Sequence, residues 1–205
     1  MRIGIIGGTF NPIHYGHLVS ASEVCNKFKL DKVIFIPSAL NPLKSTSNLA
    51  EAHHRLKMIK LAISGNPLFE ASDIEIKRGG ASYTIDTIKA FVKKYGKDVN
   101  IYFIIGTDAF LEINSWASPD ALLKMCKFIV TTRPGYDVKK AKQVFKNYTE
   151  ITEITYLEIS SSDLRKRITS GAPIKYLLPE KVENYIYKHR LYMMKNKLEL
   201  EEVVL

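Results

Sequence analysis

Cysteine is scarce in this chain of 205 residues, which contains only Cys25 and Cys126. Two cysteines are too few for a disulfide framework or a cysteine-based metal site. Both lie in segments whose apolar residues recur at helical spacing. We therefore expect two reduced thiols in the core of a cytoplasmic protein.

Long apolar runs are also missing, because none approaches the length of a membrane span. The chain opens on a strand-like segment, where a secreted protein would have a charged and then apolar leader. Repeats, low-complexity stretches and linkers are absent as well. We expect no membrane partner, and one domain over residues 1–192 with a tail over residues 193–205.

Positive charge is in excess, with 30 Lys and Arg against 21 Asp and Glu, a net charge of +9. Such an excess favours anionic partners such as nucleic acid, a membrane surface or polyphosphates. The basic residues are spread along the chain, however, with no arginine-rich arm and no lysine block. This distribution argues against a nucleic-acid partner and leaves phosphorylated small molecules.

Short runs rich in Ile, Val and Phe alternate with segments of helical spacing. The runs expected to be strands cover residues 2–6, 33–36, 73–76, 101–105, 128–132 and 154–159. The segments expected to be helices cover residues 17–29, 52–64, 84–95, 120–126, 138–148, 163–170 and 180–192. The pattern predicts an α/β, Rossmann-like doubly wound fold: a mainly parallel sheet, helices on both faces, and a small C-terminal helical part.

The first strand is followed by a loop of unusual composition, within IGIIGGTFNPIHYGHL (residues 3–18). Gly7 and Gly8 permit a close backbone approach, Pro12 fixes a turn, and a helix is expected to begin near His17. In open parallel sheets ligands bind beyond the carboxyl ends of the strands. A helix N-terminus at that place suits a phosphate, although a tight turn without a ligand would also explain the glycines.

Two familiar nucleotide signatures are absent. Gly4, Gly7 and Gly8 do not have the G-x-G-x-x-G spacing, and the second strand ends in IFIPSALNP without the acid that would hold a ribose. No G-x-x-x-x-G-K-[ST] occurs either, so a P-loop is excluded. Any phosphates must be held in another way.

His14 and His17 offer such a way, because residues three apart face one direction at the start of a helix. Their N–H groups could contact phosphate oxygens and the charge that grows on a leaving pyrophosphate. Alternatively, each histidine is a surface or core residue. A metal pair is the third alternative, but no third ligand is visible nearby, so we predict no metal site.

A second candidate phosphate site lies late in the chain, in ISSSDLRKR (Ile159–Arg167). Serine hydroxyls and backbone N–H groups converge there at an expected helix start. Arg165 can reach phosphates with its fork of donors. An N-cap cluster followed by a solvated basic helix is the alternative.

Together, the two segments resemble the paired signature of the nucleotidyltransferase superfamily, H-x-G-H and I-S-S-[ST]-x-x-R. The H-x-G-H motif is related to the HIGH motif of class I aminoacyl-tRNA synthetases. Members transfer an adenylyl or cytidylyl group and release pyrophosphate. Ser162 stands where the family often has threonine, and the hydroxyl is kept.

Within that superfamily the chain resembles the bacterial nicotinate-nucleotide adenylyltransferases through four further segments. These are SYTIDT (82–87), FIIGTDAFLEINSW (103–116), IVTTRPGYD (129–137) and IKYLLPEKVENYIYKHRLY (174–192). The resemblance implies transfer of AMP from ATP to nicotinate mononucleotide, giving deamido-NAD and pyrophosphate, with Mg²⁺ carried on ATP. Another acceptor, nicotinamide mononucleotide or phosphopantetheine, remains an alternative.

The resemblance also assigns residues. The catalytic ones are His14, His17 and Arg165. The ATP contacts are Gly8, Thr9, Phe10, His14, His17, Gly106, Asp108, Arg133, Ser161, Ser162 and Arg165. The acceptor contacts are Lys44, Thr84 and Trp116, with Trp116 stacked on the pyridine ring. From the residues alone, Asp108 could instead cap a helix, Trp116 could be core, and Arg133 could belong to an ordinary turn.

The chain departs from the family pattern near the acceptor. PSALNPLK replaces P-N-x-x-P-P-H-K, and Ala117 follows Trp116 where an aromatic residue is common. These changes affect the fine geometry of the acceptor. A synthetase-like, RNA-related protein is a less favoured alternative, since no K-M-S-K-S occurs and the length leaves no room for an anticodon-reading module. The oligomeric state, including a homo-oligomer, stays open.

Overall fold

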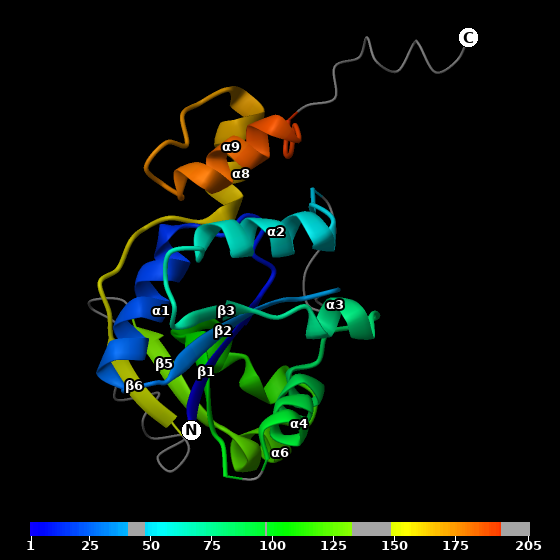
Figure 1. Cartoon of the computed structure of the whole chain (residues 1–205), viewed down its shortest axis with the longest axis vertical. Helices are drawn as coiled ribbons and strands as arrows, with labels where there is room; N and C mark the ends of the chain where they lie inside the picture. Colours follow the sequence, from blue (N-terminus) through cyan, green and yellow to red (C-terminus); the bar gives the residue numbers. More distant parts are fainter. Residues whose placement is uncertain (41–47, 97, 133–148, 194–205) are drawn as a thin grey trace.

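Six parallel strands form one sheet in the order β3-β2-β1-β4-β5-β6 (Figure 1). The computed structural model describes residues 1–40, 48–96, 98–132 and 149–193. The strands are β1 (Arg2–Gly8), β2 (Lys32–Pro37), β3 (Phe69–Ala71), β4 (Asn100–Gly106), β5 (Lys127–Thr132) and β6 (Thr149–Glu153). The predicted α/β class with a parallel, doubly wound sheet is confirmed.

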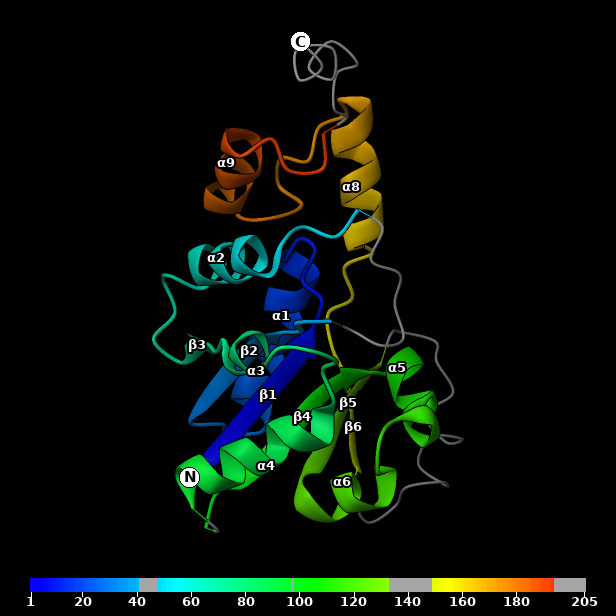
Figure 2. The same ribbon diagram turned by 90° about the vertical axis from the view of Figure 1, so that its right-hand side faces the viewer.

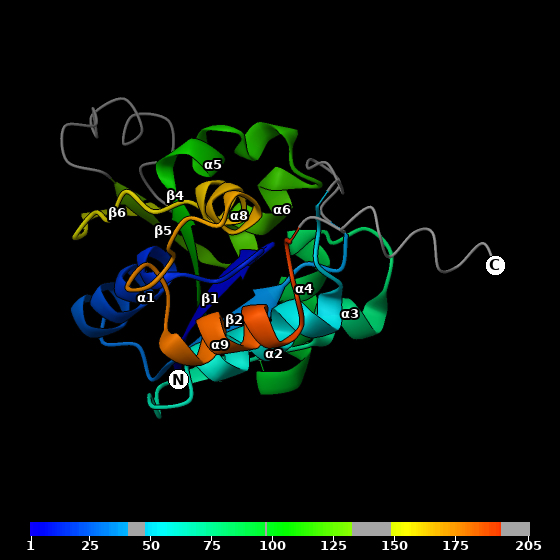
Figure 3. The same cartoon turned by 90° about the horizontal axis from the view of Figure 1, so that it is seen from above.

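Helices cover both faces of this sheet, and two more stand beyond its end (Figure 2). They are α1 (Tyr15–Lys27), α2 (Ala52–Ala62), α3 (Ile74–Arg78), α4 (Thr84–Tyr95), α5 (Thr107–Leu111), the 3-10 turn η1 (Ile113–Ser115), α6 (Pro119–Met125), α8 (Ser161–Ser170) and α9 (Glu180–Lys188). Figure 3, the view from above, shows α8 and α9 in front of the strands. This is the predicted C-terminal helical part.

The alternation of side chains along the strands divides the apolar residues into two cores. In β1, Ile6 joins the cluster that packs against α1, α2, α8 and α9. Ile3 and Ile5 join the cluster on the opposite face, under α4, α5 and α6. Gly4 keeps the backbone of β1 close to its neighbours, because a Cβ there would lie 2.8 Å from Leu30 Cδ1. Both faces are therefore filled, and β1 lies between them.

The order of the strands reverses at β1, which pairs with β2 on one side and with β4 on the other. The loops after β1 and β4 therefore leave the sheet in different directions and open a crevice between them. Because all strands are parallel, the loops after β2 and β5 begin at this same edge of the sheet. The fold thus places the glycine-rich first loop where it was expected.

Residues 73–76 were predicted to be a strand, and this prediction is wrong. The third strand is the preceding segment, β3, while α3 (Ile74–Arg78) occupies the predicted place. Alternating apolar and polar residues over four positions cannot distinguish a strand from one helical turn. Gly79, at φ 70°, then ends the helix.

The prediction of a strand over residues 154–159 is also wrong. The sixth strand is β6 (Thr149–Glu153), and the apolar stretch after it is extended without ladder partners among the described residues. Ile154 and Ile159 pack on the core beside α1, and the N–H of Thr155 donates to Glu23 Oε2 at 2.9 Å. The apolar residues of this extended stretch therefore pack beside α1.

Smaller differences concern helix ends. The first helix begins at Tyr15, two residues before the predicted start, and the last ends at Lys188, before the predicted 192. The predicted helix over residues 138–148 and nearly all of the tail lie outside the described residues.

Both cysteines are buried and free, as expected. In the described ranges, no helix has the length and apolar character that crossing a bilayer requires.

The core under α4 gives a prediction for stability. Phe91 is 1% exposed and stacks on Tyr95 with ring centroids 5.9 Å apart. Phe91→Ala leaves a cavity and should lower the free energy of unfolding by about 3–5 kcal/mol. Leu68, which is 45% exposed, provides the control, since Leu68→Ala should change it by less than about 0.5 kcal/mol. Urea denaturation of both variants checks the difference.

Candidate active site

A cleft of about 610 Å³ lies at the carboxyl ends of the strands. Its volume is in the range of small-molecule sites. It is bounded by the ends of β1, β4 and β5 and by the extended segment after β6. The predicted residues that line it are Gly8, His14, His17, Thr84, Gly106, Asp108 and Trp116. One cavity therefore brings together segments that lie between Ile6 and Ile159 in the sequence.

His14 and His17 lie side by side at the start of α1, with ring centroids 3.8 Å apart. His14 is the N-cap residue of the helix, in extended conformation. Its backbone N–H points at Nδ1 of His17 at 3.3 Å. Since that nitrogen accepts, the neutral ring of His17 carries its proton on Nε2. This tautomer presents an N–H donor.

The surroundings of Gly16 explain why the H-x-G-H motif has a glycine at this position. A Cβ at this position would lie 3.0 Å from Nδ1 and 3.1 Å from Cε1 of His14. Such a contact is closer than ordinary van der Waals contact, so a side chain would displace the ring. The glycine therefore lets the imidazole of His14 lie flat against the first turn of the helix.

The imidazole of His14 is buried, with 6% of the residue exposed. Burial lowers its pKa from the usual 6.5 to about 4. Its Nδ1 has no hydrogen-bond partner among the described residues. At neutral pH the ring is uncharged, so it can act toward a phosphate as a hydrogen-bond donor and not as a cation.

Thr9 and Phe10, two predicted ATP contacts, are not among the residues that line the cleft. Phe10 is 2% exposed and packs against His17 at 5.1 Å and Phe35 at 6.0 Å between ring centroids. The Oγ1 of Thr9 is buried, again without a partner in the described ranges. The side chain of Phe10 is therefore closed to a nucleotide, which leaves only its main chain for the predicted ATP contact.

The late serine motif lies directly against the first loop. The hydroxyl of Ser161 donates to the carbonyl of Pro12 at 2.8 Å, across 149 positions of sequence. The Arg165 guanidinium donates to the carbonyl of Asn11 at 2.9 Å and to Ser162 Oγ at 3.3 Å. The two predicted phosphate motifs thus meet, as the sequence implied.

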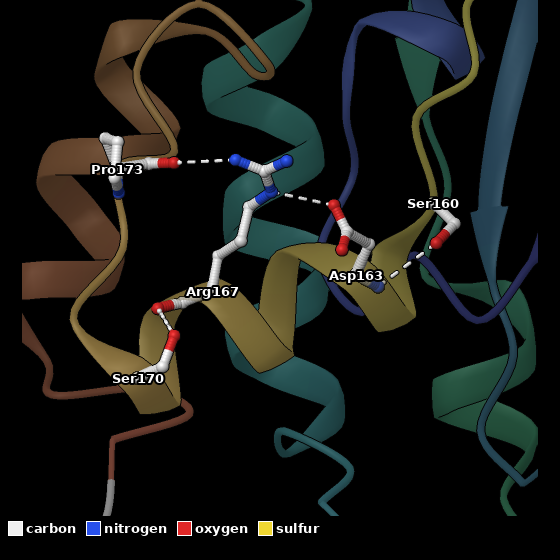
Figure 4. Close-up of polar contacts among 5 residues, drawn as sticks. All are labelled: Ser160, Asp163, Arg167, Ser170 and Pro173. Carbon is white, nitrogen blue, oxygen red and sulfur yellow. Dashed lines mark hydrogen bonds and ion pairs between the residues drawn. The ribbon is translucent and has the colours of Figure 1, made fainter.

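The start of α8 is capped by the serine that precedes it (Figure 4). Ser160 Oγ accepts the N–H of Asp163 at 3.1 Å. Asp163 in turn accepts from Arg167, four residues later, at 2.8 Å. The alternative of a capped basic helix is therefore correct for Ser160 and Arg167. Ser161 and Arg165 contact the first loop instead, whereas Ser162 is exposed and accepts only from Arg165. None of these three predicted residues lines the cleft, which reaches only as far as Ile159 before α8 begins.

The opposite part of the cleft is formed by the starts of α4 and α5 and by the residues after η1. Thr84 is the first residue of α4. Gly106, and not Asp108, is the N-cap of α5, so the alternative role of Asp108 as a cap is wrong. Trp116 packs edge-on against Phe103 at 5.9 Å and also lines the cleft, so it belongs to both the core rim and the site.

Sequence reasoning missed two buried polar residues near the site. Glu75 is 7% exposed, lines the cleft, and accepts the hydroxyl of Thr87 at 2.6 Å. Arg55 is 1% exposed and holds backbone carbonyls of three segments. The available signal for Arg55 was HRLKM (residues 54–58), which resembles an H-R-x-x-M pattern of the nicotinate-nucleotide adenylyltransferases. Lys44 and Arg133 lie outside the described residues.

Among the described residues, no three histidine, cysteine or carboxylate side chains gather as a metal site would require.

Comparison with known proteins identifies the family. The model of cytidylyltransferase-like proteins matches residues 5–167. A probable nicotinate-nucleotide adenylyltransferase of Thermoanaerobacter sp. (strain X514) is 51% identical over 199 residues, which cover 94% of each chain. One of Moorella thermoacetica is 46% identical over 198 residues, 93% of this chain and 91% of that one.

The chain belongs to the nicotinate-nucleotide adenylyltransferase family. A solved relative of this family is the Plasmodium falciparum nicotinic acid mononucleotide adenylyltransferase complexed with NaAD. It has a TM-score of 0.79 and 25% sequence identity, and the match covers 93% of this chain and 97% of that chain. The fold predicted from the sequence is thus the fold of the family.

The burial of His14 predicts a pH dependence of stability. The unfolded chain binds a proton near pH 6.5 and the folded chain only near pH 4, so the free energy of unfolding should fall as pH drops through this window. The loss is on the order of 3 kcal/mol. Urea titrations from pH 7 to 4 measure it. His14→Gln should flatten the dependence, whereas His53→Gln, with its exposed side chain, should not; an unchanged slope in His14→Gln contradicts the assignment.

Gly16 gives a second prediction for this site. Gly16→Ala should lower kcat for adenylyl transfer about tenfold, because its Cβ moves the His14 ring and small displacements in active sites are costly. The fold should survive, since alanine is a better helix former than glycine. Gly65→Ala is the matched control, as a Cβ there meets nothing within 4 Å. Equal kcat values for the two variants would contradict the role of Gly16.

Proposed function

We propose that this protein transfers the adenylyl group of ATP to nicotinate mononucleotide, as its family membership indicates. A phosphate oxygen of the mononucleotide attacks the α-phosphorus of ATP. The bond from that phosphorus to the β-phosphate bridging oxygen breaks, and pyrophosphate leaves. The products are deamido-NAD, also called nicotinic acid adenine dinucleotide, and pyrophosphate, in the biosynthesis of NAD.

One observation carries the assignment of this chemistry to the cleft. The H-x-G-H loop and the serine motif, far apart in sequence, meet through the contacts of Ser161 and Arg165 with the first loop. Two helix N-termini, those of α1 and α8, therefore converge beside one cavity. Unpaired N–H groups and the positive ends of helix dipoles stabilise bound phosphates.

The nucleophile needs no general base. A phosphate monoester has its second pKa at about 6 and is mostly dianionic at pH 7. The protein's task is to align two anionic substrates and to stabilise the charge that develops on pyrophosphate. We assign this to His14 and His17 as N–H donors and to Arg165 as the cation, with further ATP contacts by Gly8, Gly106, Asp108 and the backbone of the two motifs.

We propose that Mg²⁺ enters with ATP, as part of the substrate. No cluster of three protein ligands occurs in the described part of the chain, and Mg²⁺ in such sites is held largely by phosphate oxygens and water. When bound, it neutralises charge on the phosphates. The buried free cysteines support a reducing compartment, so we place the reaction in the cytoplasm.

The acceptor is assigned to the part of the cleft between α4 and η1. Thr84 contributes a hydroxyl and an N–H at the start of α4, and the ring of Trp116 is fixed edge-on by Phe103. A ring held in this way can stack on a pyridine. The family assignment favours nicotinate mononucleotide over phosphopantetheine. Lys44 remains a proposed phosphate contact.

A parallel assay tests the acceptor. The purified protein with ATP and Mg²⁺ is offered nicotinate mononucleotide, nicotinamide mononucleotide or phosphopantetheine, and pyrophosphate release is measured. The acid should give a kcat/KM at least tenfold above the amide. Equal rates with nicotinate and nicotinamide mononucleotide would overturn the assignment of the acceptor. Pyrophosphate release only with tRNA and an amino acid would favour the synthetase-like alternative.

A further inference from the structure

Arg55 is a buried cation of α2 that holds three separate segments together. Its Nη1 donates to the Thr9 carbonyl in the loop after β1 at 2.8 Å. Its Nη2 donates to the Ala39 carbonyl after β2 at 3.3 Å, and its Nε to the Ala50 carbonyl before α2 at 2.9 Å. These segments meet at the guanidinium, directly behind the first loop.

This arrangement is energetically demanding. Arg55 is 1% exposed, and no carboxylate among the described residues forms an ion pair with it. Burial lowers its pKa, but an arginine side chain stays protonated in proteins. Removing a cation from water costs several kcal/mol, which only well-placed hydrogen bonds offset. The three carbonyls therefore cannot move away without leaving a buried charge unsolvated.

Asn11 fixes the same region from the other side. Its Oδ1 accepts the N–H of Ala50 at 3.0 Å and the hydroxyl of Tyr192 at 2.8 Å, and its Nδ2 donates to the carbonyl of Asn48 at 2.9 Å. The residue Ala50 is thus held at its N–H by Asn11 and at its carbonyl by Arg55. The support of the loop after β1 is continuous from α2 to the C-terminal segment.

The consequence for the loop follows from peptide geometry. In a trans peptide the carbonyl and the following N–H point in opposite directions. When Arg55 holds the Thr9 carbonyl, the N–H of Phe10 therefore points away from α2. The side chain of Phe10 is fixed in the core beside His17, and its φ is 49°, so little freedom remains.

We propose that Arg55 is a positioning residue for adenylyl transfer: its guanidinium holds the Thr9 carbonyl and thereby directs the N–H of Phe10 toward the phosphates of ATP. The inference rests on the ATP contact of this loop stated under the proposed function. It explains how a phenylalanine with a buried side chain contributes to a phosphate site. Arg55 itself touches neither substrate.

Two substitutions separate charge from geometry. Arg55→Lys keeps the cation but cannot reproduce three donors in a planar fork, and Arg55→Met removes the charge at similar length. Both should lower kcat by about tenfold or more while the KM for nicotinate mononucleotide changes less than about threefold. Arg2→Lys and Arg2→Met are matched controls on an exposed arginine at the start of β1, outside the cleft lining, and should retain the wild-type kcat.

A folded Arg55→Lys protein, with unchanged circular dichroism and a kcat within about twofold of wild type, would overturn the proposal. The second readout is the amide resonance of Phe10 in ¹⁵N spectra, recorded with and without an α,β-methylene analogue of ATP. The wild type and Arg2→Lys should show a shift of this resonance. In Arg55→Lys the shift should be reduced at least severalfold, while the amide of Gly106 still responds.

The possible results separate the role of Arg55 from the contact of the first loop with ATP. If the Phe10 amide responds equally in the wild type and in Arg55→Lys, the role of Arg55 is wrong and the proposed function stands. If it does not respond in the wild type, the contact of this loop with ATP fails, and the role of Arg55 fails with it. The acceptor assay tests the reaction independently of either result.

Discussion

The contact between the two ends of the domain organises the site. Ser161 and Arg165 bind the carbonyls of Pro12 and Asn11, so that the starts of α1 and α8 converge. Neither helix alone makes a phosphate site of useful strength, since an N-terminus offers only partial charge. Contacts across 149 and 154 positions of sequence bring the starts of the two helices together at the loop after β1.

In the proposed phosphate site, two imidazoles act as neutral N–H donors beside the Arg165 cation and the helix dipoles. His14 is neutral because it is buried, and His17 presents an N–H fixed by its own tautomer. Fixed dipoles need little reorganisation when charge shifts from the α-phosphate to the leaving pyrophosphate. A site of this kind suits a reaction whose reactants are already anionic, because it can stabilise the transition state without a proton transfer.

Much of the fold and of the candidate site could be predicted from the sequence. Hydrophobic strands gave the parallel sheet, and the spacing of His14 and His17 gave paired imidazoles at a helix start. The errors fell where a pattern is too short to be decisive, as at α3, where four alternating residues form a turn of helix. The stretch after β6 is apolar because it covers α1, and β propensity cannot separate these two uses.

Other features could not be predicted, because they depend on backbone atoms from distant segments. The partners of Arg55 are three carbonyls, which every residue type possesses, so no side-chain pattern marks them. The low pKa of His14 depends on how completely the packed loop covers it. The double role of Trp116, in the core rim and in the cleft, likewise requires knowledge of its neighbours.

The contact of Tyr192 with Asn11 has a consequence for biosynthesis of the polypeptide itself. The first loop is translated before its C-terminal hydrogen-bonding partners Ser161, Arg165 and Tyr192, which follow 149, 154 and 181 positions later. A nascent chain can build much of the sheet while this loop still lacks its C-terminal supports. The full set of contacts that holds the first loop therefore forms only after Tyr192 has been synthesised.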